Sequence, residues 1–157
     1  MTQSKKIQRK VFVLAIAGGL AFWLANFAIS RTPIAAEYRA ALSISYYAML
    51  LEALLGGLMI GFCVSNFLLR FFEKIPTQDP ISKSVILTFI VLIIVTILIG
   101  GPSSFPATGN VLRYFLMGTI FNLLRFLALG IGIGYLYRRL YQGFDLAGSA
   151  SMSAQAE

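Results

Sequence analysis

Residues 84–101 read SVILTFIVLIIVTILIGG, an apolar run that contains no charged side chain. A helix needs about 20 such residues to cross the roughly 30 Å hydrocarbon layer of a membrane. Three more long, mainly apolar stretches cover residues 11–30, 42–69 and 111–137. Lipid offers the backbone no hydrogen-bond partners, and so few segments could not close a barrel, so each stretch is predicted to be a helix. We therefore expect an all-α, polytopic integral membrane protein, built as a four-transmembrane-helix up-down bundle.

Composition supports a membrane location and excludes two other classes of protein. The chain has 157 residues, of which 58% are hydrophobic and 12% are charged. Soluble domains carry about 25% charged residues, and disordered chains are poor in the Leu, Ile, Val and Phe that dominate here. A water-soluble globule and a disordered chain are therefore both excluded. We expect one domain over residues 1–142 and a disordered tail, rich in Ala and Ser, over residues 143–157.

The residues that the chain lacks narrow its chemistry. It contains no histidine and a single cysteine, Cys63. Histidine acid–base catalysis, imidazole metal sites, thiolate zinc sites and an intramolecular disulfide are therefore excluded. Cys63 lies in an apolar run, where we expect it to act as a small buried hydrophobe. The sequence predicts neither a metal nor a cofactor.

Basic residues at the ends of the four stretches predict how the chain is oriented. Nine of them would lie on the side that holds both termini, and three on the other side. Such a bias places both termini in the cytoplasm, and we expect a cytoplasmic membrane of the prokaryotic type. The nine are Lys5, Lys6, Arg9, Lys10, Arg70, Lys74, Lys83, Arg138 and Arg139, and the three are Arg31, Arg39 and Arg113.

The net charge of +7 is then mainly a signal of topology. The basic residues flank the apolar stretches instead of forming one aromatic-studded surface, so no nucleic-acid partner is expected. Besides the lipid bilayer itself, anionic lipids at the cytoplasmic face are expected partners. The basic residues before the first stretch would also suit a cleaved signal peptide. Its apolar core exceeds the usual ~7–15 residues, which favours a retained anchor.

The segment between the first two stretches, RTPIAAEYRAAL over residues 31–42, has the signals of a helix start. Thr32 is a suitable N-cap residue, and Pro33 suits the first helical position. We expect either a short interfacial helix that leads into the second stretch or an extension of that stretch. The connections at residues 70–83 and 100–110 contain proline and are predicted to be tight turns.

Small residues spaced by four predict where the helices pack closely, because they let helix backbones approach in lipid. The third stretch is β-branched and bulky and contains no such row, so it is expected at the periphery. The first, second and fourth stretches are expected to form the close-packed core. The rows comprise Ala17, Ala21 and Ala25 beside Gly18 and Gly19 in the first stretch, Ala53, Gly57, Gly61 and Ser65 in the second, and Gly118, Gly130 and Gly134 in the fourth.

Two ionisable residues lie deep inside predicted spans, Glu52 in the second and Arg125 in the fourth. Such residues are costly in a membrane, usually face the protein interior and are candidates for a functional site. Both residues lie near the middle of their spans, so an ion pair between Glu52 and Arg125 is feasible. Arg113 and a separate subunit are competing partners for Glu52. The structural alternative to a functional site is an ion pair that only fixes the helix register.

Other polar side chains share the faces of these two residues. Ser45, Glu52 and Asn66 belong to a row that repeats every seven residues, and Asn122 lies one turn before Arg125. Asn26 of the first stretch could join them. The sequence therefore predicts an intramembrane polar site of Glu52, Arg125, Asn122, Asn66, Ser45 and Asn26.

The function that these features favour is that of a non-catalytic membrane subunit or accessory protein. It would act through helix–helix association with itself or within a larger complex. The alternative is an oligomeric channel or transporter for an ion or small solute that uses the Glu/Arg polar site. An enzyme acting on a membrane-soluble substrate is the least supported interpretation, because Glu52 has no second intramembrane carboxylate to share acid–base work.

Overall fold

The computed structural model describes residues 3–77, 79–99 and 110–142. Within these ranges the chain is all-helical and contains no strand. Four helices are long and apolar enough to cross a membrane, which confirms that part of the prediction. The tail at 143–157 and most of the turn at 100–110 lie outside the described residues. The helices are α1 (Gln3–Ser30), α2 (Pro33–Ala41), α3 (Tyr46–Phe71), α4 (Pro80–Ile99) and α5 (Val111–Tyr137), with a 3₁₀ turn at Phe72–Lys74 and a π-helical turn at Arg138–Gln142.

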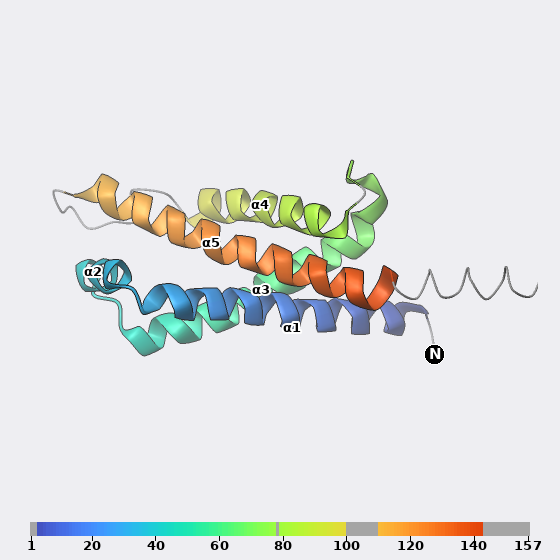
Figure 1. Cartoon of the computed structure of the whole chain (residues 1–157), viewed down its shortest axis with the longest axis horizontal. Helices are drawn as coiled ribbons and strands as arrows, with labels where there is room; N and C mark the ends of the chain where they lie inside the picture. Colours follow the sequence, from blue (N-terminus) through green and yellow to red (C-terminus); the bar gives the residue numbers. More distant parts are fainter. Residues whose placement is uncertain (1–2, 78, 100–109, 143–157) are drawn as a thin grey trace, which may run out of the picture.

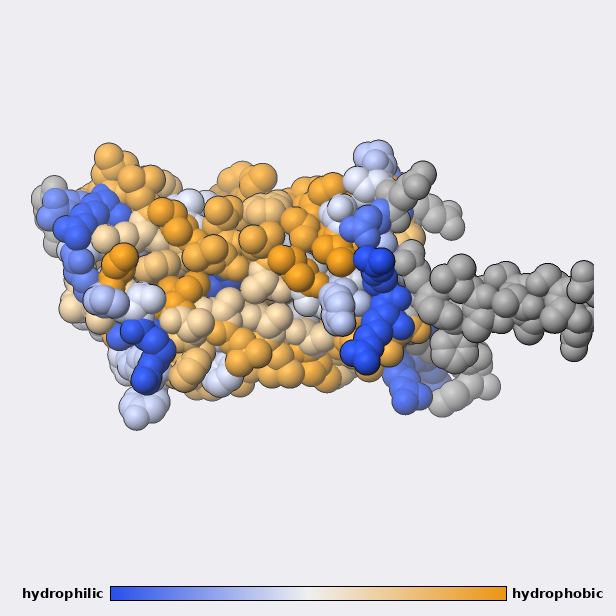
Figure 2. Space-filling view, in the orientation of Figure 1, coloured by the Kyte–Doolittle hydropathy of each residue, from blue (hydrophilic) through white to orange (hydrophobic). Residues whose placement is uncertain are grey.

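The four long helices lie side by side along one axis, and the short α2 lies at one end of them (Figure 1). The start of α1 and the end of α5 are found together at the opposite end. Hydrophilic side chains gather at the two ends of the molecule, and a broad apolar band lies between them (Figure 2). This distribution suits helices that expose apolar side chains to lipid and polar ones to water.

The helix α1 has extensive contacts with two neighbours, α3 and α5. The remaining extensive contact joins α4 to α5, whereas α3 and α4 touch more lightly and α3 hardly meets α5. The expectation that the first, second and fourth spans form the packed core is therefore wrong in one respect. The second and fourth spans, α3 and α5, lie diagonally across the bundle, and α1 lies against both.

Glycines allow α1 and α3 to approach backbone to backbone. A Cβ atom placed on Gly61 would lie 2.7 Å from the carbonyl oxygen of Ala15. A Cβ atom on Gly57 would lie 3.1 Å from the carbonyl oxygen of Gly19 and 2.9 Å from the Phe22 ring. Residues larger than glycine would thus separate these helices, which is how small residues bring membrane helices together.

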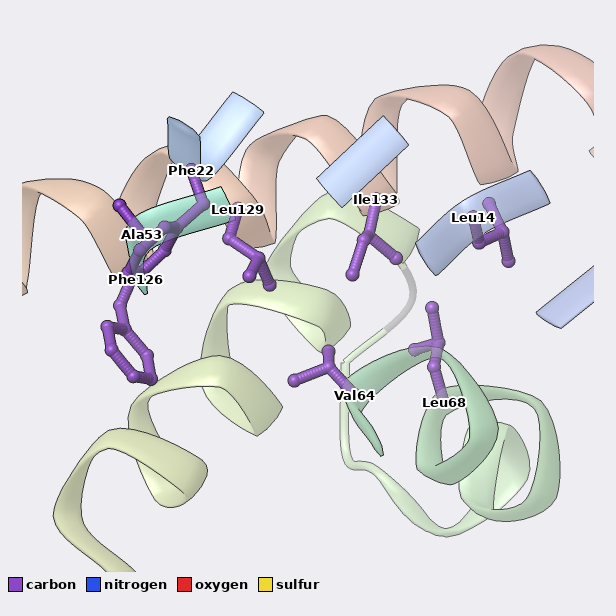
Figure 3. Packing of buried hydrophobic residues seen from close by; sticks show 8 residues of the cluster. All are labelled: Leu14, Phe22, Ala53, Val64, Leu68, Phe126, Leu129 and Ile133. Atoms are coloured by element: carbon purple, nitrogen blue, oxygen red, sulfur yellow. The ribbon is translucent and has the colours of Figure 1, made fainter. Parts of the chain in front are cut away.

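The contact between α1 and α5 also uses glycines from both helices. Gly18 of α1 lies under the side chain of Ile133, and Gly132 of α5 faces Ala21. Around these points the side chains interlock into one buried apolar cluster (Figure 3). The cluster contains Leu14, Phe22, Ala53, Val64, Leu68, Phe126, Leu129 and Ile133.

The helix α4 is the most exposed of the four spans, as its bulky sequence predicts, yet it approaches α5 closely. A Cβ atom on Gly134 of α5 would lie 2.6 Å from the Cα atom of Ile81, and one on Gly130 would lie 3.1 Å from the Cα atom of Val85. The glycines of α5 alone therefore provide the space for a close approach, so α4 needs none of its own. The outer face of α4, including Ile93 and Ile97, remains exposed.

The connection from α1 to α3 forms a separate short helix, α2, and not an extension of α3. As predicted, Thr32 caps α2, because its Oγ1 accepts a hydrogen bond from the Ala35 amide at 3.2 Å, and Pro33 opens the helix. Helical geometry is interrupted at Ser43, which has a φ of 54°. That left-handed conformation is uncommon for residues other than glycine, and it turns the chain into α3.

Two single-methyl substitutions on α3 test the backbone contact with α1. We expect Gly61→Ala to lower the free energy of unfolding by roughly 1–3 kcal/mol, because the added Cβ meets the Ala15 carbonyl group and forces a shift. Gly56→Ala is the matched control, since a Cβ there meets nothing within 4 Å. Denaturation in detergent micelles, followed by circular dichroism, measures both variants. Equal stability of the two variants would contradict the close α1–α3 contact.

Candidate functional site

Many hydroxyl groups in the spans are satisfied by their own helices. Thr88, Thr96 and Thr119 donate to the carbonyl oxygens of Ser84, Leu92 and Phe115 at 2.7, 2.8 and 2.8 Å. Such bonds to the preceding turn need no partner from another helix. Other polar groups in the spans have no such bond to their own helix.

Arg125, near the middle of α5, is the clearest of these groups. Its Nη1 donates to Oδ1 of Asn122, one turn earlier on α5, across 3.4 Å. Its Nε is buried and has no hydrogen-bond partner among the described residues. No described carboxylate lies within ion-pair distance of the guanidinium group. The guanidinium group is therefore under-satisfied for its position in an apolar span.

Tyr38 lies on α2, at the end of the bundle, and its side chain packs on α5. Its hydroxyl group lies over Gly118 of α5, where a Cβ atom would be only 2.7 Å away, and its ring meets Phe121 edge to face. Burial raises the pKa of Tyr38, and the positive charge of Arg125 partly offsets that increase. Tyr38 is therefore a neutral hydrogen-bonding group near the guanidinium.

Asn26 supplies a third polar group from α1. Its side chain is completely buried, and neither atom of its amide has a hydrogen-bond partner among the described residues. Four residues earlier, Phe22 packs on Phe126 with ring centroids 5.6 Å apart. Because α1 and α5 run in opposite directions (Figure 1), Asn26 lies near the depth of Asn122. Buried polar groups without partners are unusual and call for an explanation.

An ion pair forms nearer the α2 end of the molecule. Nη2 of Arg113 lies 2.9 Å from Oε1 of Glu37, and both side chains are substantially exposed. The pair links α2 to the start of α5. Arg113, a competing partner for Glu52 on the sequence, is therefore paired with Glu37 instead. Exposed pairs of this kind contribute little stability, about 0–1 kcal/mol.

Glu52 does not pair with Arg125, so the most specific expectation from the sequence is not met. Its side chain is exposed on α3, and no described cation lies within ion-pair distance of it. The cause is the helix order, because α3 and α5 are diagonal in the bundle and hardly meet. The neighbouring Ala53 is buried, so Glu52 projects from beside the α1 contact toward the outside of the bundle.

The remaining predicted site residues are divided between different places. Ser45 is exposed at the start of α3 and forms no side-chain cap. Asn66 is half-buried and lines a groove near the far end of α3. Only Asn122 and Asn26 thus lie near the depth of Arg125. Cys63, expected to be buried, is exposed and lines an open groove along α1 and α3.

The predicted packing residues lie inside the bundle. All of them are buried, and the glycines among them contact three different neighbours: α1, α2 and α4. The contact of Gly118 with Tyr38 was not anticipated. The set comprises Ala53, Gly57, Gly61, Ser65, Gly118, Gly130 and Gly134.

Three residues with defined roles were missed on the sequence. Tyr38 and Glu37 both lie on α2, and both contact α5, which is far from them in the sequence. Lys83 was counted as a simple interfacial charge, yet it is buried. Its Nζ donates to the Phe72 carbonyl oxygen at 2.6 Å and lies 3.8 Å from the centre of the Phe72 ring. Lys83 directly precedes the apolar run at residues 84–101, and this position was the one sign in the sequence that it could be buried.

The titration of Tyr38 reports on its neighbour Arg125. We expect Arg125→Gln to raise the pKa of Tyr38 further, because the substitution removes the positive charge that favours the phenolate. Ultraviolet titration of each protein against its Tyr38→Phe counterpart isolates this tyrosine. Folding raises the pKa above 10.0, so the contribution of Tyr38 to stability is present below that pH and falls as the pH rises through the folded-state value.

Arg113→Gln is the matched control for this titration. It removes an arginine that also contacts α2, through Glu37, but that does not influence Tyr38. We expect the Tyr38 curve to be unchanged in this variant. A curve that shifts equally in both variants would show that Arg125 has no special relation to Tyr38.

Comparisons of the chain with protein-family models, with curated proteins and with solved structures find no match. The guides to function are therefore the chain's own polar groups and surfaces. Arg125 and Asn26 carry buried polar atoms without a partner among the described residues, and Glu52 is an acidic residue on the outside of the bundle.

Proposed function

We propose that this protein is a non-catalytic membrane subunit that acts by associating, through the outer face of α3, with a second copy or with another membrane protein. The observation that carries the proposal is the exposed position of Glu52 within an apolar helix, with no cation of the described chain beside it. An acidic side chain in that position needs a polar partner that the chain itself does not provide.

The position of Glu52 along α3 determines how costly an unpaired carboxylate is in the membrane. Glu52 lies six residues after the first residue of α3, Tyr46, which is about 9 Å along the axis at 1.5 Å per residue. The 26-residue helix is about 39 Å long, so Glu52 is about 10 Å from its middle. If α3 is centred in the bilayer, Glu52 lies inside the roughly 30 Å hydrocarbon layer. A charged residue at the centre of such a helix costs about 2.5–3.5 kcal/mol, and the cost is smaller at the depth of Glu52.

The surroundings of Glu52 suit a protein neighbour better than lipid. Leu51, Leu55 and Met59 are exposed on the same part of α3 and would surround the carboxyl group with apolar contacts. A partner helix that brings a basic or hydrogen-bonding side chain would satisfy Glu52 and cover these residues at once. Polar side chains that bond across helices are a recognised means of association in membranes.

Replacing Glu52 tests the association. We expect Glu52→Gln to weaken the complex about fivefold to thirtyfold, because interhelical polar contacts in membranes contribute roughly 1–2 kcal/mol. Light scattering in a gentle detergent compares the mass of the assembly with the 17.2 kDa of one chain. Glu37→Gln, which removes an acidic residue already paired within the chain, should leave the assembly intact. A wild-type monomer without a stoichiometric partner would refute the proposal.

The orientation in the membrane forms a second part of the proposal. The excess of basic residues at the end that holds the start of α1 and the end of α5 supports cytoplasmic termini. In a Cys63→Ser background, a membrane-impermeant maleimide added to intact cells should label Arg31→Cys but not Lys74→Cys. Labelling of Lys74→Cys alone would show the reverse orientation.

A channel or transporter for a small anion is the second candidate. The unpartnered Nε of Arg125 and the unpartnered Nδ2 of Asn26 favour it, because both are donors that an anion could accept from. The same preparations, reconstituted in liposomes, distinguish the two functions. Anion flux that Arg125→Gln abolishes and Glu52→Gln does not would support transport, whereas absence of flux leaves association as the function.

A further inference from the structure

The outer surface between α1 and α3 carries a basic groove near the start of α1 and the end of α3. Its volume is ≈ 1010 Å³. Three cationic side chains and two neutral polar ones line it together with apolar residues, and its lining contains no acidic residue. The lining consists of Lys5, Ile7, Gln8, Arg9, Val11, Phe12, Phe62, Asn66, Leu69 and Arg70.

A second groove continues from the first along the same pair of helices. Its volume is ≈ 410 Å³, and its lining contains no charged side chain. Phe12 and Phe62 line both grooves and meet edge to face, with ring centroids 6.3 Å apart. The other lining residues are Ala15, Ile16, Leu58, Met59 and Cys63. A basic head region and an apolar extension are thus joined at one aromatic pair.

The helical spacing turns the cations toward the groove. Lys5 and Arg9 are four residues apart on α1, and Asn66 and Arg70 are four residues apart on α3, so each pair shares a helix face. No described carboxylate lies within ion-pair distance of Lys5, Arg9 or Arg70. Like charges with no counter-charge among the described side chains repel one another, and an anion between them would remove that cost.

We propose that these two grooves together bind one anionic phospholipid. The headgroup phosphate lies among Lys5, Arg9 and Arg70, with the Asn66 amide available as a further donor. One acyl chain follows α1 and α3 past Phe12 and Phe62 into the apolar groove. Basic pockets between membrane helices on the cytoplasmic side recognise such headgroups in this way.

A lipid suits the grooves better than a second copy of the chain. The cations lie at the helix ends and the apolar groove lies deeper, which complements the anionic headgroup and the acyl chain of a phospholipid. A second copy in the same orientation would also place its own basic end, within a net charge of +7, beside these three cations. Glu52 itself lies toward the other end of α3, and Met59 of the apolar groove also belongs to the exposed face around it.

The wild-type protein contains its own reporter for this site. Cys63 is the only cysteine, it is exposed, and it lines the apolar groove. In detergent, phosphatidylglycerol at about ten times its Kd should slow alkylation of Cys63 by N-ethylmaleimide about tenfold, because the unoccupied fraction limits the rate. Phosphatidylcholine, which has the chains without the net negative charge, should give much weaker protection. Inorganic phosphate, which has no acyl chain, should give none.

Charge removal tests the headgroup position. We expect the combined variant Lys5→Gln, Arg9→Gln and Arg70→Gln to raise the Kd for phosphatidylglycerol at least about tenfold. The matched control removes three charges from the same end of the bundle but outside the groove, through Lys74→Gln, Arg138→Gln and Arg139→Gln. It should change the Kd much less. Cys63 alkylation without lipid should be alike in wild type and both variants if the groove is intact.

The outcomes separate the lipid from other occupants. Equal protection by phosphatidylglycerol and phosphatidylcholine, or protection by phosphate alone, would overturn the proposal. An equal loss of binding in the two charge variants would also overturn it, because the attraction would then be general to the basic end. Protection of Cys63 that rises with protein concentration in the absence of lipid would assign the groove to a second copy. None of these results depends on whether Glu52 mediates association.

Discussion

The backbone contact between α1 and α3 determines how the other helices are arranged. The hydrophobic effect does not drive helices together within lipid, so van der Waals contacts between closely packed helices must provide the attraction. Gly57 and Gly61 bring α3 onto the backbone of α1 near Ala15 and Gly19. The adjacent Gly18 faces Ile133 of α5 instead. Consecutive residues lie about 100° apart around a helix, so the Gly18–Gly19 pair lets α1 accept a neighbour on each of two sides.

The glycines of α5 divide its surface in a similar way. Gly132 faces Ala21 of α1, whereas Gly130 and Gly134 face α4. Residues two positions apart lie about 200° apart around the axis, so this alternation directs close contacts to opposite sides of one helix. The bulky α4 is thereby held near the α5 backbone without small residues of its own. This arrangement leaves α3 and α5 on a diagonal and keeps Glu52 away from Arg125.

Short stretches of sequence were enough to predict the helices, but they did not predict which helices lie side by side. Hydropathy located the four spans, and Thr32 with Pro33 located the start of α2, because these signals depend on adjacent residues. A row of small residues predicts that another helix packs closely against it, but it does not predict which helix that is. The expected pairing of Glu52 with Arg125 therefore failed, and the Glu37–Arg113 pair, which joins residues far apart in the chain, gave no local signal.

The exposed faces of α3 and α4 require different surroundings. On α4 the exposed residues of the span, such as Ile90, Ile94 and Leu98, are apolar, and the exposed Thr96 hydroxyl bonds within its own helix. That face suits lipid chains without further partners. On α3 the exposed face also carries Glu52, whose carboxyl group has no partner in the described chain. The two faces therefore differ in polarity, because α3, unlike α4, exposes an acidic side chain that has no partner in the described chain.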